Sequence, residues 1–423
     1  MTDDMESRRK FLARSAAVAA SSLVVGSLNG EAAEPAVEPM PRVAGINSVY
    51  WFKSHAYHIE GRILDGYTRE GVHHQPHLKL VRMFNDQYPA SDIGRETCAK
   101  RGVELAKTIA DALGGAKGLD VDAVLLICEH GNYPQNALGQ ILYPRYEMFE
   151  EITAVFRKAG RSVPVFVDKH LSYDHRNAAK MVATSRELKF PLMAGSSLPV
   201  TWRRPEVEPA LDTPFREGLS IFGFDPDRVE IYLFHALEVL QCMWERRRGG
   251  ETGVARVRCL KGDEVWKAGD DGLWSWKLLE AALARCPSSN VGKVRDNVRE
   301  PLALLIEYRD GTRATVLNLM EQVSELAFAA TVEGRKEPTA TCFVLPPPPG
   351  AKFFDPLTWH IERFFATGKP PYPIERTLLT TTLCDLALQS AHAGGKSIES
   401  PALDVRYTPP ADSGFFRGRY TDA

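Results

Sequence analysis

The chain has no large net charge of either sign: 52 lysines and arginines oppose 54 aspartates and glutamates, which leaves −2 over 423 residues. This balance argues against nucleic acid as a partner, because nucleic-acid-binding proteins carry a basic patch or stripe. The seven cysteines are odd in number and include no C-x-x-C pair, which argues against a disulfide framework and a structural zinc site. A composition that is 44% hydrophobic and 25% charged is globular, and the length predicts at least two domains.

A membrane span is also missing from the N-terminal region. The alanine-rich run Ala16–Val25 is too short to cross a bilayer as a stable helix. It follows Arg8-Arg9 and Phe11-Leu12, the pattern of a twin-arginine export signal. We therefore expect residues 1–40 to be signal and tether, the twin-arginine machinery to be a partner, and the mature protein to be periplasmic or otherwise extracytoplasmic. A disordered basic tail is the alternative.

From Arg42 onward, short apolar strands alternate with amphipathic helices. Strands are predicted at Arg42–Ile46, Leu78–Phe84, Asp122–Cys128, Val163–Val167 and Phe190–Ala194, and helices at Ser54–Leu64, Glu96–Leu113, Glu147–Ala159 and His175–Glu187. Alternation of this kind predicts an α/β fold with a Rossmann-like, doubly wound parallel sheet.

Polar residues follow the predicted strands, and the most concentrated group is Asp168-Lys169-His170. The others are Asn47-Ser48, Asp86 and Glu129-His130. Ligands of open parallel sheets bind in the crevice outside the carboxyl ends of the strands, so these side chains are candidates for a site. Lys169 suits proton transfer because its amine titrates, whereas an arginine would stay charged. The alternative is a strand that simply reaches solvent.

The glycine fingerprint of dinucleotide-binding proteins, G-x-G-x-x-G, is absent. Its three positions read Gly45, Asn47 and Tyr50, so only the first glycine has a counterpart. If a dinucleotide binds, we expect Gly45, Asn47, Ser48 and Tyr50 over the pyrophosphate and Asp86 at the adenosine ribose. A carboxylate there favours NAD over NADP, since it accepts from the 2′-hydroxyl and repels a 2′-phosphate.

The strand that ends in an acid and Lys169, followed by Leu171-Ser172, precedes a strand that leads to Gly195-Ser196. Together with the C-terminal half, this resembles the glucose–fructose oxidoreductase, inositol dehydrogenase and MocA (Gfo/Idh/MocA) family over roughly Arg42–Pro409. The family's Glu-Lys-Pro motif reads Asp168-Lys169-His170 here. The resemblance implies NAD or NADP as cofactor, a sugar or polyol as substrate, and Lys169 at the reacting centre. Glu129, His130 and Asp168 would then lie beside the cofactor.

The family's second domain is α+β, with an open, largely antiparallel sheet. The sequence fits, with strands predicted at Glu251–Arg258, Leu302–Glu307, Ala327–Val332 and Thr339–Leu345. The resemblance therefore divides the chain into a dinucleotide-binding domain at 41–200 and a domain at 201–423 for substrate and oligomer contacts, with a homo-oligomer as a further expectation.

The helix predicted at Glu230–Glu238 carries the second set of catalytic candidates. The family often has Asp-x-x-x-His-x-x-Asp there, and side chains three or four residues apart share a helix face. His235 and Glu238 match this pattern, while Ile231 takes the place of the first acid and Glu230 is one residue out of register. The resemblance thus assigns catalysis to Lys169, His235 and Glu238. The alternative for His235 is a core histidine.

Two classes of function follow. The first is a nicotinamide-dependent oxidoreductase acting on a sugar or polyol, which the retained lysine and the predicted export favour. The second is a cofactor-free ligand-binding protein, or a metal-assisted lyase or hydrolase acting on a carbohydrate, which the missing glycines favour. Its candidate residues are Glu129, His130, Asp168, His170 and His235. We favour the first class and assign no metal.

Overall fold

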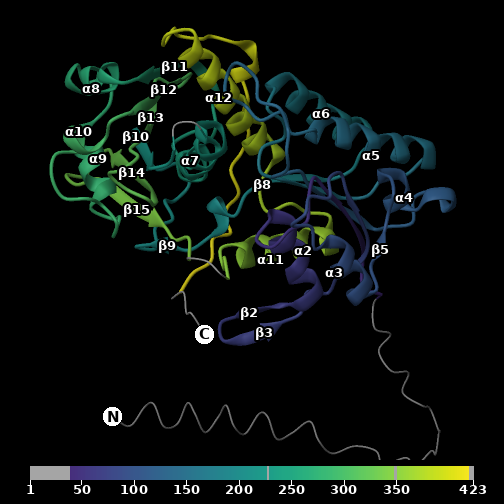
Figure 1. Ribbon diagram of the computed structural model, residues 1–423. Helices are drawn as coiled ribbons and strands as arrows, with labels where there is room; N and C mark the ends of the chain where they lie inside the picture. The colour runs from purple at the N-terminus through teal and green to yellow at the C-terminus, as the bar shows by residue number, and fades with distance from the viewer. Residues whose placement is uncertain (1–38, 226–227, 347–349, 419–423) are drawn as a thin grey trace, which may run out of the picture. The chain divides into compact units, whose positions relative to one another are not determined.

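A parallel sheet organises the first half of the computed structural model, which describes residues 39–225, 228–346 and 350–418. Its strand order is β5-β4-β1-β6-β7-β8 (Figure 1). The strands are β1 (Arg42–Asn47), β4 (Lys79–Asn85), β5 (Glu104–Leu105), β6 (Ala123–Ile127), β7 (Val165–Asp168) and β8 (Leu192–Gly195). Strand order therefore reverses at β1, which pairs with β4 on one side and β6 on the other. This is the doubly wound arrangement that the sequence predicts.

Helices cover both faces of this sheet. On one face lie α2 (His55–Asp65), α3 (Gly94–Arg101) and the C-terminal α11 (Phe354–Thr367), whose apolar side chains pack on those of β1, β4 and β6. On the other lie α4 (Ile109–Leu113), α5 (Arg145–Ala159) and α6 (His175–Glu187). Strands β6, β7 and β8 are almost wholly apolar and fully buried, as expected for strands that are covered on both faces.

The single helix predicted at Glu96–Leu113 is wrong, because the chain forms α3, β5 and α4 there. Gly102 ends α3 in the left-handed region (φ 67°), and its N–H donates to the carbonyl of Cys98. Glycine is favoured at this position because a Cβ is disfavoured at positive φ. The interruption allows the short strand β5 to pair with β4 at the edge of the sheet.

A seven-stranded sheet, in the order β11-β12-β13-β10-β14-β15-β9, organises the second half. Its strands are β9 (Arg203–Arg204), β10 (Phe215–Phe222), β11 (Val254–Lys261), β12 (Leu302–Tyr308), β13 (Arg313–Asn318), β14 (Leu326–Val332) and β15 (Thr339–Phe343). Only β10 and β13 run parallel, so the predicted, largely antiparallel character is confirmed.

Helices also cover both faces of the second sheet. One apolar core joins it to α7 (Val229–Trp244) and α12 (Ile374–His392). A second core lies under α8 (Asp263–Asp270) and α9 (Trp276–Leu283), and a short α10 (Val294–Asn297) follows. These last three helices and the hairpin of β2 (Tyr67–Arg69) and β3 (Val72–His74) add to the elements that the sequence predicts.

The C-terminal helices bind the two halves together. Besides packing on the second sheet, α12 contacts α6 and β8 of the first half, and α11 contacts α2 (Figure 1). The described residues from Met40 onward accordingly form one compact unit, in which the expected boundary near 200 lies between β8 and β9. No helix within the described ranges is long and apolar enough to cross a membrane.

Candidate functional site

A cavity of about 390 Å³ lies where the carboxyl ends of β6, β7 and β8 meet α7 of the second half. We call it the central cavity. Its polar lining includes His55, His130, Lys169, Ser196, Arg228 and His235. Its aromatic lining includes Trp51, Tyr143, Phe224, Tyr232, Phe353 and Phe354. Aromatic walls with a few convergent polar groups are typical of a small-molecule site.

Lys169 reaches this cavity because the backbone turns sharply where β7 ends. Its φ is 64°, and its N–H donates to the carbonyl of Gly195 over 3.1 Å. The left-handed region is uncommon for a residue with a Cβ, and such strain clusters at functional sites. His130, directly beyond β6, has the same unusual backbone, with φ of 70°. The two residues therefore turn into the cavity from neighbouring strands.

Glu129 neutralises Lys169. Its Oε1 lies 2.9 Å from Lys169 Nζ, and its Oε2 lies 2.5 Å from Nη2 of Arg145 on α5. All three side chains are buried. Burial alone would raise the pKa of Glu129, but the charges of Lys169 and Arg145 hold it well below its usual range. Lys169 is therefore paired with a buried carboxylate while its side chain lines the cavity.

His235 faces the cavity from α7 with one nitrogen occupied. Nδ1 lies 3.0 Å from Oγ of Ser196 and 3.2 Å from Oε2 of Glu238. Glu238 also accepts from the hydroxyl of Ser196 and from the backbone N–H of Ser196, the latter over 2.7 Å. Burial and the charge of Lys169 lower the pKa of His235. The imidazole is thus neutral near pH 7, with its proton on Nδ1 and the lone pair of Nε2 available as a base.

The structure therefore brings Lys169 and His235 to one cavity, as the sequence predicts, with Glu238 behind His235. Ile231 also lines the cavity, so the position at which the resemblance places an acid is apolar. Glu230 points elsewhere: its carboxylate accepts from the N–H of Ile141 over 3.0 Å and lies 3.4 Å from Nε2 of His170. It fixes the loop between β6 and α5.

Sequence reasoning missed three residues of this site, His55, Arg145 and Ser196. His55 is the first residue of α2, and its Nδ1 lies 2.6 Å from Oδ2 of the predicted site residue Asp168. Its ring lies 5.3 Å from that of His130, whose pKa burial lowers to about 4. The signal for His55 is its place directly after Ser54, the N-cap of the helix that follows β1.

The cofactor candidates on and after β1 are engaged within the chain. Asn47 donates to both carboxyl oxygens of Glu60 over 3.0 and 3.2 Å, and Ser48 Oγ donates to the carbonyl of Glu129 over 2.8 Å. A Cβ on Gly45 would lie 1.8 Å from Oε1 of Glu60, so the glycine makes room for this acid. Tyr50 is buried in the core between α2 and α3.

The loops that follow β4 and β6 meet across the end of β1. Asp86 accepts from the hydroxyl of Tyr133 over 2.8 Å, and Oε1 of Gln87 accepts from the N–H of Asn132 over 2.9 Å. The N–H of Gln87 also donates to the carbonyl of Ser48 over 2.9 Å. Side chains and backbone of this chain thus close the crevice where strand order reverses.

The residues of the metal-assisted alternative are not gathered into one ligand set. His170 lies in the buried network of Arg145 and Glu230, away from His235. Within the described ranges, the group of acids and histidines close enough to share an ion is Asp174 and His175, at the start of α6, with Asp385 on α12. None of these three lines the central cavity.

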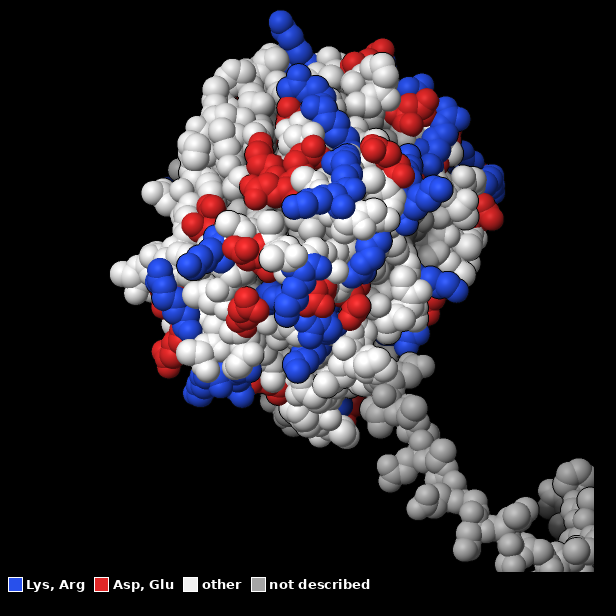
Figure 2. All heavy atoms as spheres, turned by 90° about the vertical axis from the view of Figure 1, so that its right-hand side faces the viewer, with Lys and Arg blue, Asp and Glu red and all other residues white. Residues whose placement is uncertain are grey.

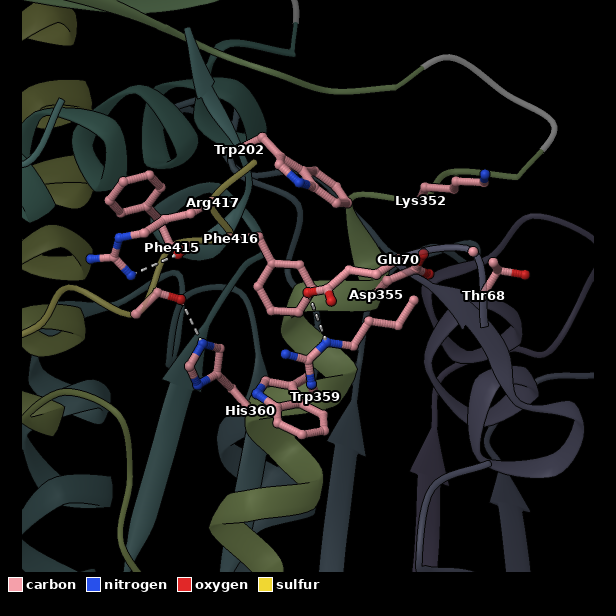
Figure 3. Close-up of a pocket in the computed structure, with 13 residues that line it drawn as sticks. Thr68, Glu70, Trp202, Lys352, Asp355, Trp359, His360, Phe415, Phe416 and Arg417 are labelled. Atoms are coloured by element: carbon pink, nitrogen blue, oxygen red, sulfur yellow. Dashed lines mark hydrogen bonds and ion pairs between the residues drawn. The ribbon is translucent and has the colours of Figure 1, made fainter. Parts of the chain in front are cut away.

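A second cavity, of about 340 Å³, lies between the β2–β3 hairpin, α11 and the C-terminal segment (Figure 3). Phe416 lies between Trp202 and Trp359 in this view, and the guanidinium of Arg69 covers the ring of Trp359 at 3.9 Å. Nε2 of His360 donates to the carbonyl of Gly414 over 2.7 Å. No strand end of the parallel sheet reaches this cavity, so the central cavity is the better candidate.

Comparison with solved structures identifies dehydrogenases. GenD2 from gentamicin A biosynthesis, in a complex with NAD, has a TM-score of 0.55 at 13% identity, covering 87% of this chain and 99% of its own. A probable dehydrogenase from Thermotoga maritima has a TM-score of 0.52 at 15% identity (86% and 100% covered). Myo-inositol 2-dehydrogenase from Lactobacillus plantarum has 0.51 at 12% identity (85% and 99% covered).

The chain has the fold of these dehydrogenases. No protein-family model and no curated protein matches it. The predicted resemblance to the Gfo/Idh/MocA family is therefore confirmed at the level of the fold.

A dinucleotide does not fit the described conformation at its usual place. It would cross the end of β1, where the Tyr133–Asp86 and Asn132–Gln87 contacts lie. The glycines that let the pyrophosphate approach the backbone are replaced by Asn47, which is bonded to Glu60, and by buried Tyr50. Hydride transfer to a nicotinamide would require a different arrangement of these loops.

Proposed function

We propose that this chain is an enzyme of the oxidoreductase class that acts on a sugar or polyol in the central cavity. The observation that carries the proposal is the meeting of Lys169, from the first half, with His235, from the second half, in one aromatic-walled cavity. Several hydroxyls of a substrate would find donors and acceptors on Lys169, Ser196 and the histidines.

His235 is the proton acceptor in this proposal. Its Nε2 takes the proton of a substrate hydroxyl, while Glu238 and Ser196 hold Nδ1 and stabilise the imidazolium that forms. Lys169, which is paired with Glu129, donates a hydrogen bond to a substrate oxygen. A positioned base of this kind contributes on the order of a hundred- to ten-thousand-fold in rate.

NAD or NADP is the proposed cofactor of this oxidoreductase form, and Asp86 would favour NAD. The support is the fold, since one structural neighbour is in complex with NAD. Binding of the dinucleotide would require the loops after β4 and β6 to move apart. Loop rearrangements of this kind occur in a substantial minority of complexes. The measurement is calorimetry with NAD, NADH, NADP and NADPH in turn.

A second candidate is a cofactor-free reaction on the same class of substrate, which the closed crevice over β1 favours. In this form the histidines and Lys169 supply acid–base chemistry alone. Calorimetry separates the two candidates: heat from one dinucleotide that is lost in Asp86→Ala supports oxidoreduction. Absence of heat with all four, from a protein that still binds a sugar or polyol, leaves the cofactor-free form.

A further inference from the structure

We infer that His55 and Asp168 form a second proton-transfer pair of the central cavity, acting together with His235. The inference deepens the proposed function and rests on one part of it, namely that a sugar or polyol binds in this cavity. Nδ1 of His55 lies 2.6 Å from Oδ2 of Asp168. The side chain of His55 keeps 17% of its exposure, whereas that of Asp168 has none.

The contact with Asp168 determines which nitrogen of His55 is available. A carboxylate only accepts, so the proton of the neutral imidazole lies on Nδ1 and the lone pair on Nε2. His55 lines the cavity, and Asp168 does not. Oδ1 of Asp168 is buried without a hydrogen-bond partner among the described residues, which leaves its charge for the imidazole. The pair thus repeats the arrangement of His235 with Glu238.

The groups around His55 come from several elements. Its ring lies 5.3 Å from that of His130 in the loop after β6 and 5.0 Å, edge to face, from that of Phe354 on α11. The ammonium of Lys169 follows Asp168 in sequence and is paired with Glu129. His55 thus faces the cavity between a second histidine and an aromatic ring, with the carboxylate of Asp168 at its Nδ1.

Two such pairs allow a sugar that carries a carbonyl group to be isomerised without an oxidant. One imidazole removes the proton from the carbinol carbon, and the C–H electron pair forms the carbon–carbon double bond of an enediol. The carbonyl oxygen takes a proton from Nε2 of the other imidazole, which has taken up that proton from solvent beforehand. The reverse transfers then place a proton on the former carbonyl carbon and release one from the former hydroxyl. Electrons and protons balance, because each imidazole returns to its starting state.

The test uses diethyl pyrocarbonate, which modifies unprotonated imidazole nitrogens, on the whole protein, with rates read for each histidine by peptide mass spectrometry. His175 is the matched control, since its Nδ1 lies 2.6 Å from Asp385 and its side chain keeps 16% exposure, outside the cavity. We expect Asp168→Asn to slow modification of His55 by roughly tenfold or more, because an amide donor forces the other tautomer. Asp385→Asn should slow only His175.

Long-range ¹H–¹⁵N spectra of the wild type should show His55 protonated on Nδ1, a readout that needs no variant. Saturating D-fructose or myo-inositol should protect both His55 and His235 from the reagent, but not His175. Protection of His235 alone, an Nε2-protonated His55, or an unchanged rate in Asp168→Asn would overturn the inference and leave the proposed function standing. Protection of neither cavity histidine would overturn the sugar or polyol site, and the inference with it.

Discussion

At the scale of single residues, Lys169 and His235 carry the strongest prediction. Lys169→Met removes the amine and His235→Asn removes the base, so each should lower turnover of a sugar or polyol that the wild type converts by about a hundred- to ten-thousand-fold. The loss in His235→Asn should depend on pH, since it removes a titrating group. Steady-state kinetics of both variants, beside Lys158→Met on the exposed end of α5, provide the measurement.

Stability must be measured beside turnover, because Lys169→Met leaves the buried Glu129 with Arg145 as its remaining cation. Loss of one partner from a buried ion pair is destabilising, so a lower melting temperature is expected. Adding Glu129→Gln to Lys169→Met would leave the buried Arg145 without its paired carboxylate, so the double variant should melt at a still lower temperature and recover no turnover. A fully active Lys169→Met would end the case for this centre.

The sequence pointed to Lys169, His130 and His235 because each lies at a strand end or on a helix face whose direction the pattern predicts. It could not point to His55 or Ser196, since their roles depend on partners distant in the chain: Asp168 lies 113 residues from His55. The left-handed backbone of Lys169 and His130 was not predictable either, because neither residue is a glycine or an asparagine, the types that usually adopt it.

At the scale of elements, the packing of α2 on β1 depends on one buried acid. Burial raises the pKa of Glu60 to about 8, although the hydrogen bond from Asn47 lowers it in part. The folded state therefore keeps a proton that the unfolded chain loses near its ordinary pKa of 4.5. Its contribution to stability is complete below that value and is lost as pH rises toward 8.

Glu60→Gln should abolish this dependence. We expect the melting temperature of the wild type to fall, relative to that of the variant, as pH rises from about 5 to about 8. The difference between the two proteins isolates Glu60 from the histidines that titrate in the same range. Glu280→Gln, at an exposed position of α9, is the control. Parallel curves for wild type and Glu60→Gln would show that Glu60 is ionised in the folded protein.

Elements were predictable where one pattern ran without interruption. The helix expected at His175–Glu187 is α6 residue for residue, because its apolar positions repeat at helical spacing and Asp174 caps it. The helix expected at Glu96–Leu113 failed because a periodic pattern continued across Gly102, where the chain leaves the helix to form β5. The missing glycine fingerprint had the larger consequence, since the loop after β1 now packs into the core through Val49 and Tyr50.

At the scale of the whole molecule, the site depends on C-terminal helices that pack back onto the first half of the chain. No local sequence pattern predicts this packing. Helices α11 and α12 come back from the second sheet to the first, and the central cavity is lined by both halves. Charges are interspersed on the face shown in Figure 2, in keeping with the sum of −2. The resemblance to a known family, rather than composition or periodicity, was what predicted that two domains would share one site.

Export is also a property of the whole molecule, and its signal lies outside the described residues. We propose that Arg8 and Arg9 direct the folded protein through the twin-arginine pathway, which reads this pair directly. Arg8→Lys with Arg9→Lys should therefore hold the precursor in the cytoplasm, measured by immunoblots of cytoplasmic and exported fractions. Arg42→Lys, on β1 beyond the expected signal, serves as the control and should be exported like the wild type. A cleaved double-lysine variant in the exported fraction would show that the chain leaves the cytoplasm by another route.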